Sequence, residues 1–455
     1  MPERRGCRRH LFLSFFCGSQ ETVTEEKLIR TVGFKTIVAL TINGIIGAGI
    51  FALPANTARV LGVASPVAFL IAGLFTLILV LCFAELGGLY DRTGGAYLYA
   101  SEAFGGMIAF LIGWMYFLAR LTSTAALSNA LVGFIGFFFP LVTPWREIVI
   151  AVALLIFAAI NYLGIQLSTR VITGLTIIKL LALASFIFIG IFFVKWEIFR
   201  SIEFPSSSNL TTAILPAMYA FTGFEIIAVP SAEYVNPKRN LPLGILGGSS
   251  IAIAIYILIQ TVAVGVDPNI ATSEAPLAQA ASLFIGPSGS ALISAGAIFS
   301  TIGTIIAILL IAPRILYAMA LEQQLPSKLA TIHPRFRTPS FAIISFTLIT
   351  LPVAISTSFI KLATLSAMSR LITYIGSAIA LLILRPKKSS QDSFRIPGGP
   401  TIPVLAILLC LFFLTAATRK DWVAGGIAII VGLILYGVAA RKQIHHEAIE
   451  NTKQY

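Results

Sequence analysis

Charge is scarce in this sequence. Only 11% of its 455 residues are charged, whereas a soluble globular protein of this length carries about a quarter. Cysteine and histidine are also rare, at four residues each, and none of them stands at the spacing of a metal site or a disulfide framework. These shortages argue against an ordinary soluble enzyme, and they give no support to a metal or any other cofactor.

Apolar residues are correspondingly abundant. They make up 57% of the chain, and the mean hydropathy is +0.92. Apolar runs recur along almost the whole length, which predicts an all-α polytopic membrane protein embedded in a lipid bilayer. The net charge of +13 does not indicate a nucleic acid partner, because the basic residues lie in short loops between apolar runs, where they set topology.

Twelve apolar runs meet or approach the length of about 20 residues that a bilayer core requires. They cover residues 33–60, 64–86, 104–137, 146–165, 170–194, 209–232, 243–266, 288–313, 340–357, 359–384, 401–418 and 422–440. Most lysines and arginines fall in the two tails and the even-numbered loops, so both termini are predicted to be cytoplasmic. The compact loops favour a bacterial inner membrane.

The first run contains three glycines near its middle, Gly44, Gly47 and Gly49. Each glycine costs about 1 kcal/mol relative to alanine in a helix interior, so local unwinding is expected. Unwound backbone at this depth must face protein or a polar cavity. Small residues also permit close helix packing, and this run alone does not separate the two interpretations.

The sixth run is interrupted in a similar way. Thr222, Gly223 and Glu225 lie between Pro216 and Pro230 in an otherwise apolar segment. Interrupted spans at corresponding positions of two halves are typical of a transporter whose binding site lies at the membrane midplane. The interval of five spans predicts that helices 1–5 and 6–10 are inverted repeats, with helices 11 and 12 at the periphery.

The predicted organisation follows from these spans. It comprises a cytoplasmic tail (1–32), a first repeat (33–194), a second repeat (195–384) with an outer loop (195–208), the last two helices (385–440) and a cytoplasmic tail (441–455). The N-terminal apolar stretch Leu11–Cys17 is too short for a signal peptide and lacks a cleavage motif. We therefore interpret residues 1–28 as a cytoplasmic extension.

The two interruptions also suggest a ligand. The half-helix after Gly49 would direct free amides and a positive dipole end toward the cavity, which suits a carboxylate. Unwound carbonyl groups suit an ammonium group. An amino acid carries both groups on one carbon, although separate anions or cations also satisfy the pattern.

Several motifs are specific when taken together. They are Gly44–Phe51, Ala84–Leu86, Gly94–Tyr99, Phe104-Gly105 with Gly113-Trp114, Phe221–Glu225, Asn236–Pro242, and Pro313-Arg314 followed by Tyr317–Ala320. Over about residues 30–440 the chain resembles the amino acid, polyamine and organocation superfamily of permeases, nearest to its proton-coupled and cationic amino acid branch. The resemblance implies the leucine-transporter fold, with 12 helices in a 5+5 inverted repeat and with helices 1 and 6 broken.

The resemblance also implies roles for matching residues. The substrate carboxylate would bind the first break at Gly47, Ala48 and Gly49. The amino group would meet the carbonyls of Ile45, Tyr219 and Thr222, and Phe221 would cover the site as part of a gate. Many relatives have serine at the position of Ala48, so here the carboxylate would depend more on backbone amides.

Lys179 lies near the middle of the fifth span, where a charge costs about 3 kcal/mol or more. Burial favours the neutral amine, so this lysine could exchange a proton between access states. The resemblance places its ammonium where sodium-coupled relatives bind sodium. The alternatives are a fixed ion pair or a lysine that caps exposed carbonyl groups.

Three further features leave alternatives open. Glu225 either responds to pH and helps gating, as in some relatives, or ties the half-helix to a neighbouring span. Arg120 and Arg370 lie inside spans, and either could pair with Glu225 or contact the substrate. The loop Glu85–Phe104 corresponds to the segment that the family uses for inner closure, and its charged residues could equally be a solvated surface.

The sequence therefore predicts a secondary active amino acid permease that works by alternating access, is coupled to protons and needs no sodium. The alternative is an exchanger of the same fold that trades an amino acid for its decarboxylated amine. A membrane-embedded enzyme lacks a nucleophile and base constellation, and a channel would need a continuous polar lining. The spans hold no acidic cluster beyond Glu225, which favours neutral or broad substrates.

Overall fold

The computed structural model describes residues 30–201, 206–356, 359–387, 394–415, 417 and 419–453. These residues form α-helices joined by turns and short 3₁₀ segments, and they contain no β-strand beyond one isolated bridge between Val32 and Tyr234. The α-helices are α1 (Phe34–Ile45), α2 (Gly49–Leu61), α3 (Ser65–Leu89), α4 (Ala96–Phe104), α5 (Gly106–Phe138), α6 (Arg146–Tyr162), α7 (Ile165–Gly190), α8 (Ser207–Ala220), α9 (Pro237–Val266), α10 (Pro276–Ile285), α11 (Pro287–Leu321), α12 (Ser340–Ser356), α13 (Phe359–Lys387), α14 (Thr401–Leu414) and α15 (Arg419–Lys453). The all-helical class predicted from the apolar runs is confirmed.

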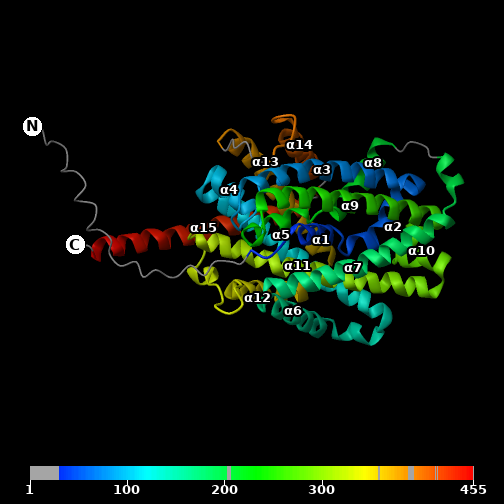
Figure 1. Ribbon diagram of the computed structural model, residues 1–455, viewed down its shortest axis with the longest axis horizontal. Coiled ribbons are helices and arrows are strands. Elements are labelled where there is room, and N and C mark those ends of the chain that lie inside the picture. The colour runs from blue at the N-terminus through cyan, green and yellow to red at the C-terminus, as the bar shows by residue number, and fades with distance from the viewer. Residues whose placement is uncertain are drawn as a thin grey trace, which may run out of the picture.

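Each predicted run carries helix. The first run holds two helices, α1 and α2, and the sixth holds α8 followed by the 3₁₀ helix η5 (Phe224–Ala228). Within the described residues, eight helical stretches are long and apolar enough to cross a membrane, and four apolar helices are shorter. Two helices outside the predicted runs, α4 and α10, lie at opposite ends of the bundle (Figure 1).

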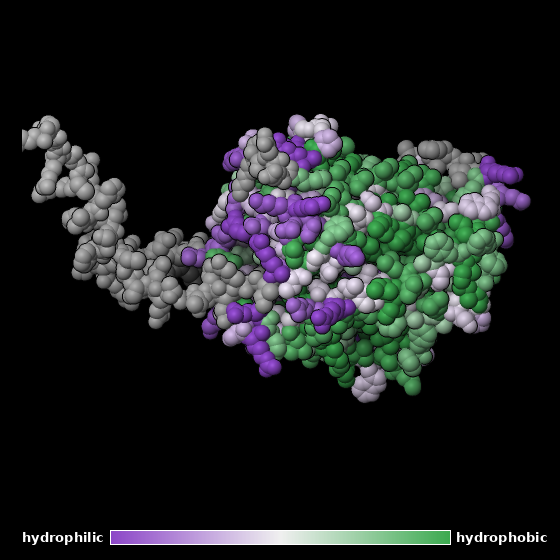
Figure 2. Space-filling view, in the orientation of Figure 1, coloured by the Kyte–Doolittle hydropathy of each residue, from purple (hydrophilic) through white to green (hydrophobic). Residues whose placement is uncertain are grey.

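The surface divides into an apolar middle and polar ends. Figure 2 shows apolar side chains over the centre of the visible face, while polar ones gather at the end that holds α4 and, in smaller number, at the end that holds α10. We refer to these as the α4 end and the α10 end. Large apolar side chains such as Leu181, Phe188, Leu408 and Ile434 are exposed, as expected for a surface that lipid covers.

The interior brings the interrupted helices together. Three pairs of long helices pack against each other, namely α3 with α9, α5 with α13 and α7 with α11. α1 packs against α7, α9 and α11, and α8 packs against α2 and α3. Both interruptions are therefore enclosed by protein, which is what unwound backbone in a bilayer requires.

Candidate functional site

The first interruption lies between α1 and α2, at Ile46, Gly47 and Ala48. This is the unwinding that the three glycines predicted. Side chains from other helices hold the carbonyl groups that leave the helical pattern. Ser300 Oγ on α11 donates to Ile46 O at 3.0 Å and to Gly47 O at 3.1 Å, so the exposed backbone is satisfied within the protein.

The second interruption follows α8, at Phe221, Thr222 and Gly223. Gly223 has φ of 115°, in the left-handed region that favours glycine. The chain then continues as 3₁₀ turns rather than as the α-helix expected for the second half of this span. A Cβ atom on Gly44 would lie 2.8 Å from Gly223 O, so the two interruptions approach each other through glycine backbone.

Tyr256 on α9 connects the two interruptions. Its hydroxyl donates to Ile45 O at 2.9 Å and to Ala220 O at 3.4 Å, the last residues of α1 and α8. Its ring centroid lies 4.9 Å from that of Phe221, which is fully buried. The sequence analysis did not single out Tyr256 as a functional residue. The one feature that could have indicated it is a polar hydroxyl within the long aliphatic run of residues 243–266.

We expect Tyr256→Phe to loosen both interruptions. The substitution removes the donor for two buried carbonyl groups, at a cost of about 1–3 kcal/mol. Hydrogen–deuterium exchange in peptides covering residues 44–51 and 219–225 should accelerate about five- to 150-fold, the range that this free energy corresponds to. Unchanged exchange in both peptides would show that Tyr256 does not hold them.

Tyr162→Phe is a matched control for this experiment. Tyr162, at the end of α6, packs with its ring against His333 and Phe336. The same loss of a hydroxyl at this distant position should leave exchange at both interruptions unaltered.

A cavity lies between the interruptions. It contains about 430 Å³ of space free of protein atoms, part of which opens to solvent. It is lined by Gly44, Ile45, Gly47, Ala48, Gly49, Arg120, Ser123, Leu127, Ala220, Thr222, Gly223, Ile226, Thr304, Ile308 and Arg370. Five of the seven predicted substrate-binding residues are in this lining: Ile45, Gly47, Ala48, Gly49 and Thr222.

The other two predicted binding residues differ. Phe221 is fully buried beside Phe69 and Tyr256, and it is not in the cavity lining. Tyr219 lies in α8, but its side chain is outside the part of the chain that the structure describes. The start of α2 borders the cavity at Ala48 and Gly49, so a positive helix end faces the enclosed space.

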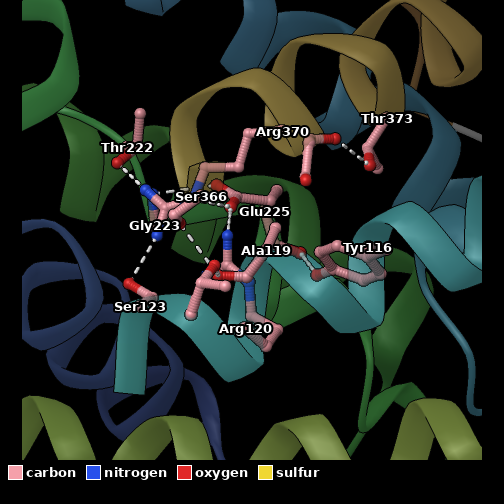
Figure 3. Close-up of polar contacts among 12 residues, drawn as sticks. Tyr116, Ala119, Arg120, Ser123, Thr222, Gly223, Glu225, Ser366, Arg370 and Thr373 are labelled. Atoms are coloured by element: carbon pink, nitrogen blue, oxygen red, sulfur yellow. Dashed lines mark hydrogen bonds and ion pairs between the residues drawn. The ribbon is translucent and has the colours of Figure 1, made fainter. Parts of the chain in front are cut away.

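Two arginines and one glutamate form the charged part of the site (Figure 3). Arg120 on α5 donates to Glu225 Oε1 at 2.5 Å, and Glu225 Oε2 accepts from the amide of Gly223 at 2.9 Å. Arg370 on α13 donates to the hydroxyl of Thr222 and, at 2.8 Å, to Ser123 Oγ. Its Nε atom lies 4.0 Å from Glu225 Oε1. The structure thus brings together three ionisable residues that the sequence could not pair.

Lys179 lies beside the first interruption. Its side chain is fully buried, and Nζ donates to Ile46 O at 2.5 Å and contacts Ser300 O at 3.5 Å. This geometry is the carbonyl-capping arrangement that the sequence left as one alternative. The same hydrogen bond places an ionisable amine against the backbone of the first interruption, between α1 and α2.

The α4 end is closed by ionic and backbone contacts. Arg314 on α11 forms a buried ion pair with Glu233, whose carbonyl accepts from the amides of Thr31 and Val32 at 3.1 Å. Glu85 at the end of α3 pairs with Arg385 on α13 at 2.6 Å. These contacts connect the residues before α1, Thr31 and Val32, to Glu233, which follows η5, and connect Glu233 to α11.

The segment Glu85–Phe104 takes part in this closure; it comprises the end of α3, a short loop and the helix α4 rather than one loop. The amide of Gly94 donates to Val229 O at 3.0 Å, which links the loop to the segment after the second interruption. Most residues from Thr93 through Ala100 are buried, so this part of the segment is packed, whereas Asp91 and Arg92, which come just before it, are exposed.

Comparison with known proteins supports this picture. The sequence model of the amino acid permease family matches residues 32–438. The chain is 30% identical over 436 residues to a serine/threonine exchanger of Bacillus subtilis, which covers 91% of this chain and 98% of that protein. It is 27% identical over 454 residues to a branched-chain amino acid permease of the same organism, covering 92% and 95%.

A human protein is also similar. Cationic amino acid transporter 4 is 28% identical over 407 residues, which cover 83% of this chain and 63% of the human protein. The matched family and these relatives are transporters rather than enzymes, as the sequence predicted. The chain is therefore a multi-pass membrane protein that belongs to the amino acid permease family of the amino acid, polyamine and organocation superfamily.

Proposed function

We propose that this protein is a secondary active transporter that moves amino acids across the membrane by alternating access. The observation that carries the proposal is the cavity between two interrupted helices, which is lined by backbone of both interruptions and enclosed by α5, α11 and α13. Such interruptions supply amides and carbonyls to a substrate without exposing them to lipid.

The proposed architecture has 12 spans. α1 with α2 forms span 1, α8 with η5 forms span 6, and spans 1–5 and 6–10 are inverted repeats, followed by α14 and α15. The two termini are proposed to be cytoplasmic, because most lysines and arginines fall in the tails and the even-numbered loops. The α4 end, where most of the polar surface gathers (Figure 2), is proposed to face the cytoplasm of a bacterial cell.

Substrate binding is proposed at the predicted residues. The amides at Gly47, Ala48 and Gly49 receive the carboxylate at the start of α2. The ammonium group meets carbonyls at Ile45, Tyr219 and Thr222. Ile45 O accepts from the hydroxyl of Tyr256 and from the amide of Gly47, each at 2.9 Å. Both lone pairs of this carbonyl oxygen are therefore used, and substrate binding at these atoms replaces the hydrogen bond between Gly47 and Ile45.

Proton coupling is proposed to depend on Lys179. A protonated amine stabilises the exposed carbonyl of Ile46, and its deprotonation weakens that contact, so the charge state of the lysine biases the position of the first interruption. Exchange is the alternative, since a relative that is 30% identical is a serine/threonine exchanger. An exchanger does not require Lys179 to change its charge.

Proteoliposomes separate the two functions. Without sodium, an imposed inward proton gradient should drive accumulation of a labelled amino acid mixture, and an uncoupler should abolish it. Lys179→Ala should reduce this accumulation to the level of protein-free vesicles while counterflow, in which internal amino acid exchanges for labelled amino acid, continues.

Lys195→Ala is the matched control, because this exposed lysine lies just after α7, and the variant should accumulate substrate normally. Uptake that requires internal substrate and ignores the gradient would identify an exchanger and overturn the role of Lys179 in coupling. Loss of both accumulation and counterflow in Lys179→Ala would assign the lysine to maintaining the interruption instead.

A further inference from the structure

The charged groups that line the cavity have one sign. Arg120 and Arg370 both border it, and no Asp or Glu does so among the residues that the structure describes. Both guanidinium groups are almost entirely shielded, with residue exposures of 1% and 5%. A charge held this deeply in a membrane protein requires compensation.

One carboxylate, that of Glu225, is shared between the two arginines. Its Oε1 atom accepts from Arg120 at 2.5 Å, and its Oε2 atom accepts from the Gly223 amide at 2.9 Å. Arg370 is more distant, at 4.0 Å from the same carboxylate. The cluster of two arginines and one glutamate therefore carries a net charge of +1 beside the cavity, and a zwitterionic substrate with a neutral side chain would leave this charge unchanged.

Arg370 is arranged so that it can receive an anion. Its guanidinium donates to two neutral hydroxyl groups, of Thr222 and Ser123, both of which line the cavity (Figure 3). The planar fork of an arginine matches a carboxylate in bidentate geometry. A substrate carboxylate at this position would bring a negative charge to Arg370, the arginine that lies farther from Glu225.

We propose that the transporter selects amino acids with an anionic side chain, whose second carboxylate binds Arg370. This inference rests on the proposed function and specifies its substrate class. The α-carboxylate of the substrate binds at the start of α2, and its side-chain carboxylate binds Arg370. The ion pair between Arg120 and Glu225 is retained. A cationic side chain would meet like charge, and a neutral one would gain no ionic contact.

The test compares amino acids that differ in charge but not in size. Proteoliposomes at pH 7 are assayed by counterflow for labelled glutamate against glutamine and for aspartate against asparagine. We expect the acids to be preferred at least tenfold by the native protein. Thermal stabilisation of the purified protein by the same four compounds reports binding without a driving gradient.

Variants of Arg370 locate the selectivity. Arg370→Gln should remove the preference for acids, and Arg370→Lys should retain a positive charge and part of the preference. Arg170→Gln applies the same change to an exposed arginine of α7 and should leave selectivity as in the native protein. Retention of the full acid preference in Arg370→Gln would overturn the assignment of this residue.

The outcomes also separate this inference from the proposed function. Efficient counterflow of glutamine or asparagine with tenfold weaker transport of the acids would overturn the anionic substrate class and leave the transporter intact. If none of a full set of amino acids shows counterflow or accumulation, the proposed function itself fails. The comparison of acids with amides in the native protein tests the substrate class even if an Arg370 variant does not fold.

Discussion

Gly223→Ala should slow transport at least about 30-fold. The glycine at the second interruption has φ of 115°, a conformation that costs an alanine about 1–3 kcal/mol. A Cβ atom here would also overlap the carbonyl of Gly44, and an overpacked site costs about 1–3 kcal/mol more. The sum of at least about 2 kcal/mol corresponds to at least about a 30-fold loss of transport rate, measured as counterflow into proteoliposomes.

Gly133→Ala supplies the comparison. Gly133 lies in α5, another helix long and apolar enough to cross a membrane. Apart from its chain neighbours and the nearby backbone of its own helix, no atom lies within 4 Å of a Cβ placed on it. This variant should transport as well as the native protein. Equal rates for the Gly223 and Gly133 variants would contradict the close approach of the two interruptions. The reciprocal change Gly44→Ala should be intermediate, because its Cβ meets Gly223 O at 2.8 Å without a positive φ.

The sequence was sufficient for the features that a local pattern encodes. Length and hydropathy indicated the apolar helices, because a helix in lipid must satisfy its own backbone. The glycines of the first run and the Thr222–Gly223 pair of the sixth indicated where helix would fail. The same reasoning missed the 3₁₀ turns after Gly223, because they arise from packing against α1, α3 and α9 rather than from local preference.

Contacts between distant segments could not be predicted. The hydroxyl of Tyr256 reaches a carbonyl 211 residues earlier in the chain, and Ser300 reaches Ile46 across 254 residues. A single sequence shows that Tyr256 and Ser300 are polar within apolar runs, but it does not show which way they face. In the same way, the sequence does not show which way Arg120 and Arg370 face. The fold places both of them beside Glu225.

Glu225→Gln should cause the largest loss of stability among substitutions at the site. The carboxylate is fully buried against Arg120, and Arg370 lies 4.0 Å away. An amide of the same size removes the buried negative charge that faces both guanidinium groups. Breaking a buried ion pair by removing one partner costs about 3–5 kcal/mol, so the free energy of unfolding in an SDS titration should fall by about this amount.

An exposed pair provides the control for this measurement. Arg30 and Asp91 lie 3.3 Å apart, and about half of each side chain is exposed. Exposed pairs contribute about 0–1 kcal/mol, so Asp91→Asn should change the free energy of unfolding by no more than that. A loss in Glu225→Gln as small as that in Asp91→Asn would contradict the buried pairing.

A double-mutant cycle isolates the pair itself. Arg120→Gln alone leaves Glu225 with its more distant partner, whereas Arg120→Gln combined with Glu225→Gln removes one charge of each sign and restores the net charge of the cluster. The double variant should therefore be more stable than the sum of the two single losses predicts, by more than the 0.5 kcal/mol within which independent sites add. Strict additivity would mean that Arg120 and Glu225 stabilise the protein through other contacts. Arg370 is unchanged in the double variant, so this variant should still prefer acidic substrates. Stability and substrate selectivity would then depend on different residues of the same cluster.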